Sequence, residues 1–346
     1  MSRTPRTALR LPVILALAAA LVAGCSGSGK DSAGSPTPTA GSPTPTPTPS
    51  ASPVSVPLNP LTGTPVGVNN QVLAVKIDNT QPAFPQQGVE NADVVYLEEV
   101  EGGLTRLCAV FSSNLPGRLG PVRSVRETDI ELLAPYGKVA FAFSGGNKGV
   151  LPKVHASPLI DVSVDRVSSK YYRVFGGRHA PYNLFTNPRA LLAAKPNSAR
   201  VHDVGFHFGT ASTPGTPAHS FSIAFLRARA TWTWSPAEGR WLLAMNGRPD
   251  RVVGGAQIGA DNVIVQLVTI QRSRFSDVNG VTSPITRTVG SGRTMYFRDG
   301  TVTAGTWSRS GSHATVYRDA NGKPYLLKPG KTWVILVRKG TNVPVS

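Results

Sequence analysis

Cysteine is nearly absent from this chain, which holds only Cys25 and Cys108 among its 346 residues. Two thiols cannot build the disulfide framework of a small secreted domain, so the folded body must be stabilised by its hydrophobic core. Cys108 lies in an apolar run and has no histidine beside it. A free cysteine in that setting is usually a small buried side chain, and we expect Cys108 to be structural.

The short motifs that mark common catalytic and cofactor sites are also missing. The sequence contains neither G-x-x-x-x-G-K-[ST] nor G-x-G-x-x-G, and no H-E-x-x-H, C-x-x-C or Ser-x-x-Lys pattern. His202 and His207 are five residues apart, a spacing that does not place them on one helix face, so we expect neither to bind a metal. The sequence therefore predicts no metal site and no cofactor.

The N-terminal apolar run Leu11–Ala23 has thirteen residues, too few for a membrane span, which takes about 20 residues. It follows three arginines and ends in the small residues before Cys25, the order that is typical of a secretory signal. Leu-Val-Ala-Gly-Cys at 21–25 resembles a bacterial lipobox. The resemblance implies cleavage before Cys25 and a diacylglyceryl group on its sulfur, and two acyl chains suffice for stable anchoring. We expect residues 1–24 to be a signal peptide and the protein to be anchored at the cell membrane, facing the extracytoplasmic side.

Residues 25–57 cannot bury a core. After Cys25 they are almost wholly Ser, Thr, Pro, Ala and Gly, with Thr-Pro repeats between Pro36 and Pro49. Such a composition is typical of a disordered linker, and we interpret this segment as a tether that holds a folded body, residues 58–346, away from the membrane.

Acidic side chains are scarce, with 19 Asp and Glu against 36 Lys and Arg and a formal net charge of +17, or +14 without the three signal arginines. In a cytosolic protein this balance would favour nucleic acid as the partner. Export makes nucleic acid the minor interpretation, because an exported basic surface meets anionic lipid headgroups and phosphate-bearing wall polymers. Attraction to either would weaken with salt.

The densest acidic stretch coincides with the clearest hairpin signal, the apolar segment Asp93–Phe111 interrupted by Gly102-Gly103. A glycine pair favours a two-residue turn, which sets Glu99 opposite Arg106 as a cross-strand ion pair. Both faces of this hairpin are apolar, which predicts a central position in a sheet covered on both sides. One face would carry Val95, Leu97, Cys108 and Val110.

Two adjacent capping boxes, Ser124-Val-Arg-Glu127 and Thr128-Asp-Ile-Glu131, predict a helix start, and the sequence does not choose between them. Arg123 and Arg126 lie at or near this start, where the helix dipole opposes a cation. One hypothesis is that an anion binds between them, since backbone N–H groups at a helix start favour anions. The alternative is that they pair with acidic neighbours: Glu98, Glu101, Glu127 or Asp129.

A glycine turn, Ser144-Gly145-Gly146-Asn147, follows the expected strand at 138–143 and could bring backbone N–H groups close to a ligand. Arg178 and Asn183, in Arg178-His-Ala-Pro-Tyr-Asn-Leu184, form a second polar group that either lines the same cleft or shapes a turn.

From Phe221 onward the chain consists of short β-type runs separated by turn signals such as Asn246-Gly247 and Asp299-Gly300. This pattern predicts an antiparallel meander, with Phe297 opposite Val302 across the Asp299-Gly300 turn. The five tryptophans at strand spacing are expected in the core. The fold class that follows is α/β (α+β): a β-rich layered sandwich with a mixed sheet and helices in the N-terminal part, residues 58–215, and the meander in the C-terminal part, residues 216–346.

Motifs spread over the whole folded body resemble those of the YerB-like lipoproteins. They are Asn59-Pro-Leu-Thr-Gly63, Val75-Lys-Ile-Asp-Asn79, Ala92-Asp-Val-Val-Tyr96 with Glu98-Glu-Val-Glu-Gly-Gly103, Gly120-Pro-Val-Arg-Ser124 with Asp129, Ala180-Pro-x-Asn-Leu184, Asp261-Asn-Val-Ile-Val-Gln266 and Pro329-Gly-Lys-Thr-Trp333. The resemblance implies a β-rich α/β fold and an envelope location, without an established activity. Tyr182 stands where relatives tend to have histidine, which weakens any acid–base role there.

The leading hypothesis is a non-catalytic binding lipoprotein that recognises an anionic envelope ligand through Arg123, Arg126 and Ser144–Asn147, with Arg178 and Asn183 nearby. The alternative is a hydrolase of wall polymer, with Glu98 as the acid and Glu101 or Asp129 as its ionised partner. Glu98 lies on an apolar face of the hairpin, so it must either bond to a partner or reach a cleft. A third class, an envelope scaffold for a protein partner, would expose an apolar patch on the C-terminal sheet.

Overall fold

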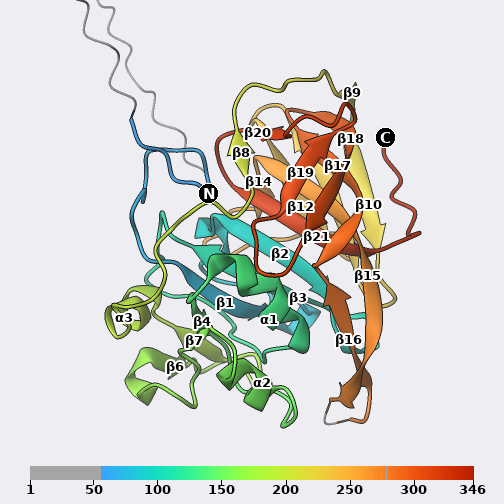
Figure 1. Cartoon of the computed structure of the whole chain (residues 1–346). Coiled ribbons are helices and arrows are strands. Elements are labelled where there is room, and N and C mark those ends of the chain that lie inside the picture. Colours follow the sequence, from blue (N-terminus) through green and yellow to red (C-terminus); the bar gives the residue numbers. More distant parts are fainter. Residues whose placement is uncertain (1–55, 278) are drawn as a thin grey trace, which may run out of the picture. The chain divides into compact units, whose positions relative to one another are not determined.

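The computed structural model describes residues 56–277 and 279–346. The predicted signal peptide, the lipidation site at Cys25 and most of the tether lie outside these residues. The described part forms layers around one large mixed sheet (Figure 1).

Within the described residues, twelve strands belong to this sheet. Its main order is β19-β18-β17-β15-β21-β2-β3-β1-β4-β5, with β16 paired to β15 and β9 to β18. The strands are β1 Leu73–Asp78, β2 Val94–Glu99, β3 Thr105–Phe111, β4 Ala140–Ala142, β5 Ile160–Asp161, β9 Thr216–Pro217, β15 Asn262–Ser276, β16 Thr282–Arg287, β17 Gly290–Arg298, β18 Thr301–Arg309, β19 Val316–Asp319 and β21 Thr332–Arg338.

A smaller sheet of short strands covers part of one face. It consists of β10 Ser220–Ala224, β11 Arg229–Ser235, β12 Arg240–Met245, β13 Arg248–Pro249 and β14 Gly259–Ala260. Two further pairs complete the strands: β6 Tyr172–Val174 with β7 Leu184–Thr186, and β8 His207–Phe208 with β20 Leu326–Leu327. The α-helices are α1 Glu127–Leu133, α2 Leu151–His155 and α3 Pro188–Ala193.

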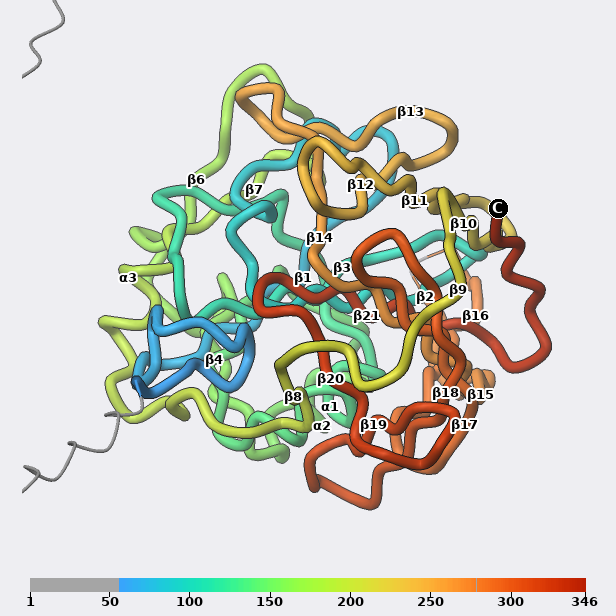
Figure 2. The backbone as a smooth tube through the Cα atoms, turned by 90° about the horizontal axis from the view of Figure 1, so that it is seen from above, coloured from blue at the N-terminus to red at the C-terminus, as the bar shows by residue number. Residues whose placement is uncertain are grey.

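The large sheet carries a hydrophobic cluster on each face. One cluster joins Trp333 of β21 and Phe297 of β17 to Trp232 and Trp241 of the smaller sheet. The other packs under α1 and α2. Figure 2 shows β11–β13 on one side of the central strands and α1 and α2 on the other. The predicted two-sided cover of the hairpin is therefore confirmed, and so is the burial of Cys108.

The β-rich α+β class is confirmed, and the meander is correct for most of its strands. Phe297 pairs with Val302 as expected, and β10–β12 and β17–β19 are antiparallel. Strand β21 departs from this pattern, because it runs parallel to both β15 and β2. The last long strand therefore joins the N-terminal strands to the C-terminal ones within one sheet.

The tryptophans follow the prediction closely. Trp232, Trp241, Trp307 and Trp333 are buried, and Trp234 is half-buried beside Trp241. Large aromatic side chains bury much apolar area, so Trp232, Trp241 and Trp333 account for a substantial part of the contact between the two sheets, whereas Trp307 packs on the opposite face of the large sheet. Helix α3 begins directly after Asn187, whose side chain accepts the backbone N–H of Ala190.

Candidate functional site

The β2–β3 hairpin differs from the prediction by one residue of register. Glu98 lies opposite Arg106, and Glu99 lies opposite Thr105. The predicted pairing of Glu99 with Arg106 is therefore wrong. A shift of one residue exchanges the faces of one strand relative to the other, so Cys108 shares its face with Tyr96 instead of Leu97.

The cause lies in the loop. The Val100 N–H donates to Leu104 O at 2.8 Å, so three residues, Glu101–Gly103, connect the strands instead of two. Gly102 and Gly103 have φ values of 66° and 72°, in the left-handed region that glycine adopts without strain. The glycine pair marked the turn correctly but not its length.

A buried ion cluster connects β1, β2 and α1. The Lys76 ammonium contacts Glu98 and lies 2.7 Å from Asp129 Oδ1, and all three side chains are fully buried. Burial alone would lower the pKa of Lys76, but Asp129 and Glu98 outweigh it and raise the pKa to about 12. Burial raises the pKa of the Glu98 carboxyl above its usual value, against the opposing effect of Lys76.

This burial argues against the hydrolase alternative. A general acid and its partner must reach the substrate, whereas Glu98 and Asp129 are both inaccessible to solvent and share one lysine. Glu101, the third carboxylate of that hypothesis, is bound by Arg126 and Ser283. Of the two outcomes expected for Glu98, a bonded partner or a cleft, the structure has the partner.

A second charged cluster surrounds Asp78 at the end of β1. Arg123 Nε lies 2.6 Å from Asp78 Oδ2, and Arg106 Nη1 lies 3.4 Å from Oδ1. Arg123 also lies over the Tyr182 ring, 5.5 Å from its centroid. Asp78 and Lys76 both lie in the motif Val75-Lys-Ile-Asp-Asn79, but no role was predicted for either. The sequence does contain a signal for this site: Lys76 and Asp78 are two charged residues on one face of β1, whose other residues are apolar.

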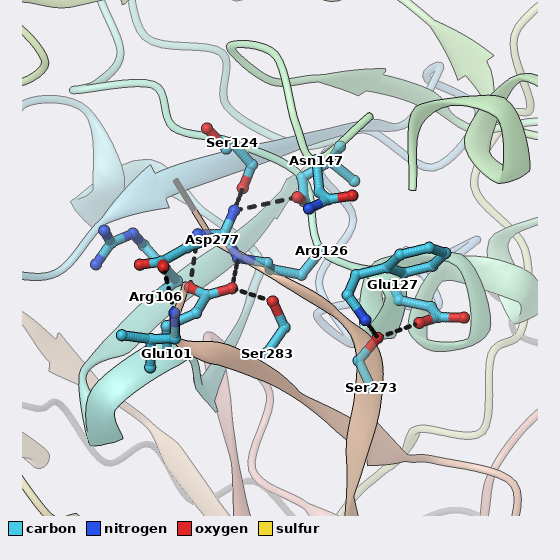
Figure 3. Close-up of polar contacts among 12 residues, drawn as sticks. Glu101, Arg106, Ser124, Arg126, Glu127, Asn147, Ser273, Asp277 and Ser283 are labelled. Atoms are coloured by element: carbon cyan, nitrogen blue, oxygen red, sulfur yellow. Dashed lines mark hydrogen bonds and ion pairs between the residues drawn. The ribbon is translucent and has the colours of Figure 1, made fainter. Parts of the chain in front are cut away.

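Arg126 is held by a two-point ion pair with Glu101. Its Nε lies 2.7 Å from Oε1, and its Nη2 donates to Oε2 at 2.7 Å. Its Nη1 donates to the Ser124 and Val125 carbonyl oxygens, and Ser283 Oγ donates to Glu101 (Figure 3). Although burial raises it, the bonds and charge of Arg126 keep the pKa of Glu101 below its usual value.

The anion site predicted between Arg123 and Arg126 is therefore not supported, because both guanidinium groups already face carboxylates. The alternative prediction, pairing with acidic neighbours, is correct for Glu101 and Arg126. The partner of Arg123 is Asp78, which was not among the candidates.

Helix α1 uses neither predicted capping box. It begins at Glu127, and the Arg126 N–H donates to Asp129 Oδ2 at 2.7 Å. Ser124 donates to the Ser144 carbonyl oxygen instead. Asp129 therefore serves two purposes, since its other oxygen accepts from Lys76. With seven residues α1 is too short to offer a strong N-terminal dipole.

The remaining predicted site residues are structural neighbours of this region. The Ser144 N–H donates to Arg123 O, the Gly145 carbonyl accepts from Val125 N, and Gly146 forms a bridge with Val125. The Asn147 side chain binds Ser276 O and the Gly149 N–H. The Ser144–Asn147 turn therefore uses its polar groups on the chain itself.

Arg178 and Asn183 lie in the β6–β7 hairpin. Arg178 donates to the Ala83 and Pro85 carbonyl oxygens, and Asn183 accepts the Phe175 N–H through its backbone. These contacts support the turn interpretation of this second polar group.

An open groove of about 400 Å³ lies beside Glu101, between the β2–β3 loop, the β15–β16 ribbon and the end of β21. We call it the hairpin groove. None of the eight predicted ligand-binding residues lines it. Its lining residues are Glu99, Val100, Gly102, Gly103, Ile270, Gln271, Arg272, Gly280, Val281, Thr282, Ser283, Pro284 and Arg338.

The charge of the hairpin groove is mainly positive. Arg272 is exposed and donates to Thr282 Oγ1 at 3.3 Å, across the β15–β16 ribbon. Arg338 donates to Ile270 O at 3.0 Å and lies 3.9 Å from Glu99, the single carboxylate of the lining. The sequence pattern offered no signal for either arginine, because they come together only through the pairing of β15 and β21.

Fold and site together define a strand-rich α+β protein with a buried ion cluster and an open, basic groove beside it. The described residues contain no group of three or more His, Cys, Asp or Glu side chains arranged to hold a metal ion. Among the helices described, none combines the length and the apolar character that crossing a membrane requires.

The chain belongs to a family described as a protein of unknown function, DUF3048. The N-terminal domain of that family matches residues 61–201 and its C-terminal domain matches residues 221–334. The hairpin groove is lined by residues of both matched regions and by Arg338.

Two comparisons agree with this assignment. The chain is similar to "Putative lipoprotein YerB" of Bacillus subtilis (strain 168), with 22% identity over 292 residues, covering 83% of this chain and 87% of that protein. It also resembles the crystal structure of the YerB protein from Bacillus subtilis, with a TM-score of 0.72 and 20% identity over 84% of this chain and 99% of the other. The second likeness establishes the fold.

Proposed function

We propose that this protein is a lipid-anchored binding protein on the extracytoplasmic side of the cell membrane, which holds an anionic ligand of the cell envelope in the hairpin groove. The anchoring part rests on the lipobox-like residues 21–25, with the lipid on Cys25, and on the similarity to a chain named as a lipoprotein. Two acyl chains would keep the protein on the membrane, while residues 25–57 would let the folded body reach outward.

One observation carries the binding part: two guanidinium groups, Arg272 and Arg338, face one groove whose lining has a single carboxylate, Glu99. Guanidinium groups form paired hydrogen bonds with phosphate and carboxylate oxygens. At about 400 Å³ the groove can take a segment of a polymer rather than a lone ion. A phosphate-bearing wall polymer is the anionic partner that an exported surface with this charge would meet.

The proposed ligand site differs from the site that the sequence predicts at the start of α1. Arg123 and Arg126 have structural partners in Asp78 and Glu101, so replacing them would disturb the fold before it disturbed a ligand. Arg272 and Arg338 are exposed at the groove and can exchange solvent for a ligand. Their replacement should leave the thermal stability nearly unchanged.

The test is sedimentation of the full chain with purified cell-wall fragments, with and without their phosphate polymer. The Arg272→Gln/Arg338→Gln double variant should bind at least about tenfold more weakly than the unmodified chain at low salt, since hydrogen bonds to charged groups are lost. Arg229→Gln/Arg293→Gln is the matched control: it removes the same charge from exposed positions outside the groove. It should retain most of the binding.

Three results would refute the proposal. Equal binding by the groove variant and the unmodified chain would exclude the groove. Equal losses in both double variants would mean that net charge, and no particular site, attracts the polymer. Binding that persists on fragments stripped of phosphate would exclude the polymer as the ligand.

A further inference from the structure

A second groove, of about 220 Å³, lies away from the hairpin groove, where the 84–85 segment meets the smaller sheet. We call it the Asp250 groove. Its walls combine apolar and basic side chains around one acid: Phe84, Pro85, Met245, Arg248, Pro249, Asp250 and Arg251. It does not depend on the proposed function, because it shares no residue with the hairpin groove.

Asp250 is the unusual member of this groove. It is 3% exposed, and neither of its carboxylate oxygens has a hydrogen-bond partner. Its backbone is fixed in the sheet, since its N–H donates to Leu243 O at 2.9 Å and its carbonyl accepts from Ile258 N at 2.8 Å. Burial raises the pKa of the carboxyl to about 7. A buried carboxyl group without a hydrogen-bond donor is costly, so Asp250 lowers the stability of the folded state.

A second acceptor without a donor lies at the same junction. Gln86 is fully buried, and its Nε2 donates to Asp78 O at 2.7 Å, which fixes the orientation of the amide. Its Oε1 has no partner. The Gln86 backbone accepts from Val253 N at 2.8 Å, three residues beyond Asp250, so both acceptors belong to one contact between the two segments.

The arginines around this contact form no hydrogen bond with either acceptor. Arg251 donates to Gly255 O at 2.6 Å, and Arg248 is exposed on the short strand β13. Arg178 lies against the 84–85 segment and donates its hydrogen bonds to the Ala83 and Pro85 carbonyl oxygens. The groove therefore combines an acid without a donor, apolar walls and two exposed cations.

We propose that the Asp250 groove binds the adjacent ammonium and carboxylate groups of an amino acid, with the ammonium on Asp250 and the carboxylate on Arg248 and Arg251. An ammonium supplies the donors that the Asp250 carboxylate lacks, and guanidinium groups suit a carboxylate. The apolar walls formed by Phe84, Pro85 and Met245 fit the aliphatic part of such a ligand. Both a free amino acid and an amino acid with both groups free at the end of a peptide side chain carry this chemistry.

The experiment is titration calorimetry of the full chain in detergent and phosphate buffer with lysine, D-alanine and L-alanine. A peptide with a free amino-carboxylate side-chain end forms a separate arm and distinguishes the two sources. Propylamine and propionate carry one charge each and serve as probes of the two halves of the site. The expected result is saturable binding of the amino acids or the peptide, with propionate far weaker.

Asp250→Asn should weaken amino-acid binding by about tenfold or more, because the charged partner of the ammonium is lost. Arg248→Gln/Arg251→Gln, at two exposed positions, should reduce amino-acid affinity to that of propylamine and leave propylamine unchanged. Asp203→Asn, at an exposed aspartate outside both grooves, is the control and should bind normally.

The double arginine variant keeps the proposal testable if Asp250→Asn fails to fold. The proposal is overturned if none of the zwitterionic probes saturates the chain in the millimolar range. It is also overturned if Asp250→Asn and the unmodified chain bind equally. Propionate binding as tightly as the amino acids would show a carboxylate site formed by the arginines alone.

Discussion

Lys76 Nζ lies 2.7 Å from Asp129 Oδ1 in the interior, so a single ammonium on β1 holds the first turn of α1 to the sheet. Glu98 of β2 contacts the same ammonium. Buried charges are tolerated when they are paired, and this pairing spans three elements that are far apart in the sequence. The cluster therefore fixes the positions of α1 and of the β2–β3 hairpin, which lie beside the hairpin groove.

Replacing Lys76 by Met should strongly destabilise the protein. The substitution keeps most of the apolar stem of the side chain but leaves Glu98 and Asp129 buried without a cation, which we expect to cost about 3–5 kcal/mol. Urea unfolding followed by circular dichroism measures the change. Lys138→Met, at an exposed lysine, should stay within about 0.5 kcal/mol of the unmodified chain. A similar stability for both variants would contradict the structural importance of the cluster.

Much of the fold could be predicted because its signals are local. Trp232 and Trp234 alternate with polar neighbours along a short run, and Asp299-Gly300 fixes the register of the β17–β18 hairpin. The β2–β3 register could not be read in the same way, because two glycines fit a two-residue or a three-residue loop equally well. The choice depends on packing of the whole hairpin rather than on the turn.

The site depended on contacts that sequence spacing does not reveal. Lys76 lies on a strand with alternating character, which would ordinarily predict an exposed polar face. Its burial becomes evident only when β1 is placed beside β3 and α1 covers that face. The hairpin groove likewise depends on β21 entering between β15 and β2, a parallel arrangement without any local signal.

The effect of Asp250 on the stability of the folded state should depend on pH. Burial raises the pKa of this carboxyl in the folded state to about 7, while the unfolded chain releases the proton near the ordinary value. The folded state then binds more protons, so its stability falls as pH rises from about 4 to about 7. The side chain of the Asp250→Asn variant cannot titrate, so this decrease in stability should be absent from the variant.

The measurement is urea unfolding of both forms at pH 5 and pH 8 in phosphate buffer without amines. The stability difference between Asp250→Asn and the unmodified chain should shift in favour of the variant by about 3 kcal/mol between these values. Asp203→Asn provides the control for an exposed aspartate and should show little shift. An unchanged difference at the two pH values would mean that Asp250 is ionised normally.

Arg126 and Glu101 should couple strongly in a double-mutant cycle. Their two-point contact is largely buried, and removing one partner leaves the other charge without compensation. We expect a coupling energy of about 1–3 kcal/mol between Arg126→Met and Glu101→Gln. Arg287 and Glu131, 3.0 Å apart but more exposed, form the comparison pair and should couple by less than about 1 kcal/mol. Denaturant unfolding of the seven forms tests this, and equal coupling in both pairs would count against a special role for the buried one.

Gly103 and Gly102 should respond differently to alanine, although both have positive φ values and both line the hairpin groove. A Cβ on Gly103 would lie 2.3 Å from Leu226 Cβ and 3.1 Å from its Cα, so the neighbouring β10–β11 turn would have to move. A Cβ on Gly102 would approach nothing closer than Arg227 Nη1 at 3.6 Å. Gly102→Ala should therefore cost only the backbone strain, about 1–2 kcal/mol.

Gly103→Ala should cost about 1–3 kcal/mol more than Gly102→Ala, because it adds displacement of a packed segment to the same strain. The Arg227 N–H, which donates to Gly103 O at 3.0 Å, would be pulled from its acceptor as the turn moves. Thermal unfolding compares the two variants, and amide hydrogen exchange at Arg227 reports the local displacement. Equal melting temperatures together with unchanged exchange at Arg227 would mean that the loop relaxes without moving the turn, and the groove wall would then be more adaptable than this geometry implies.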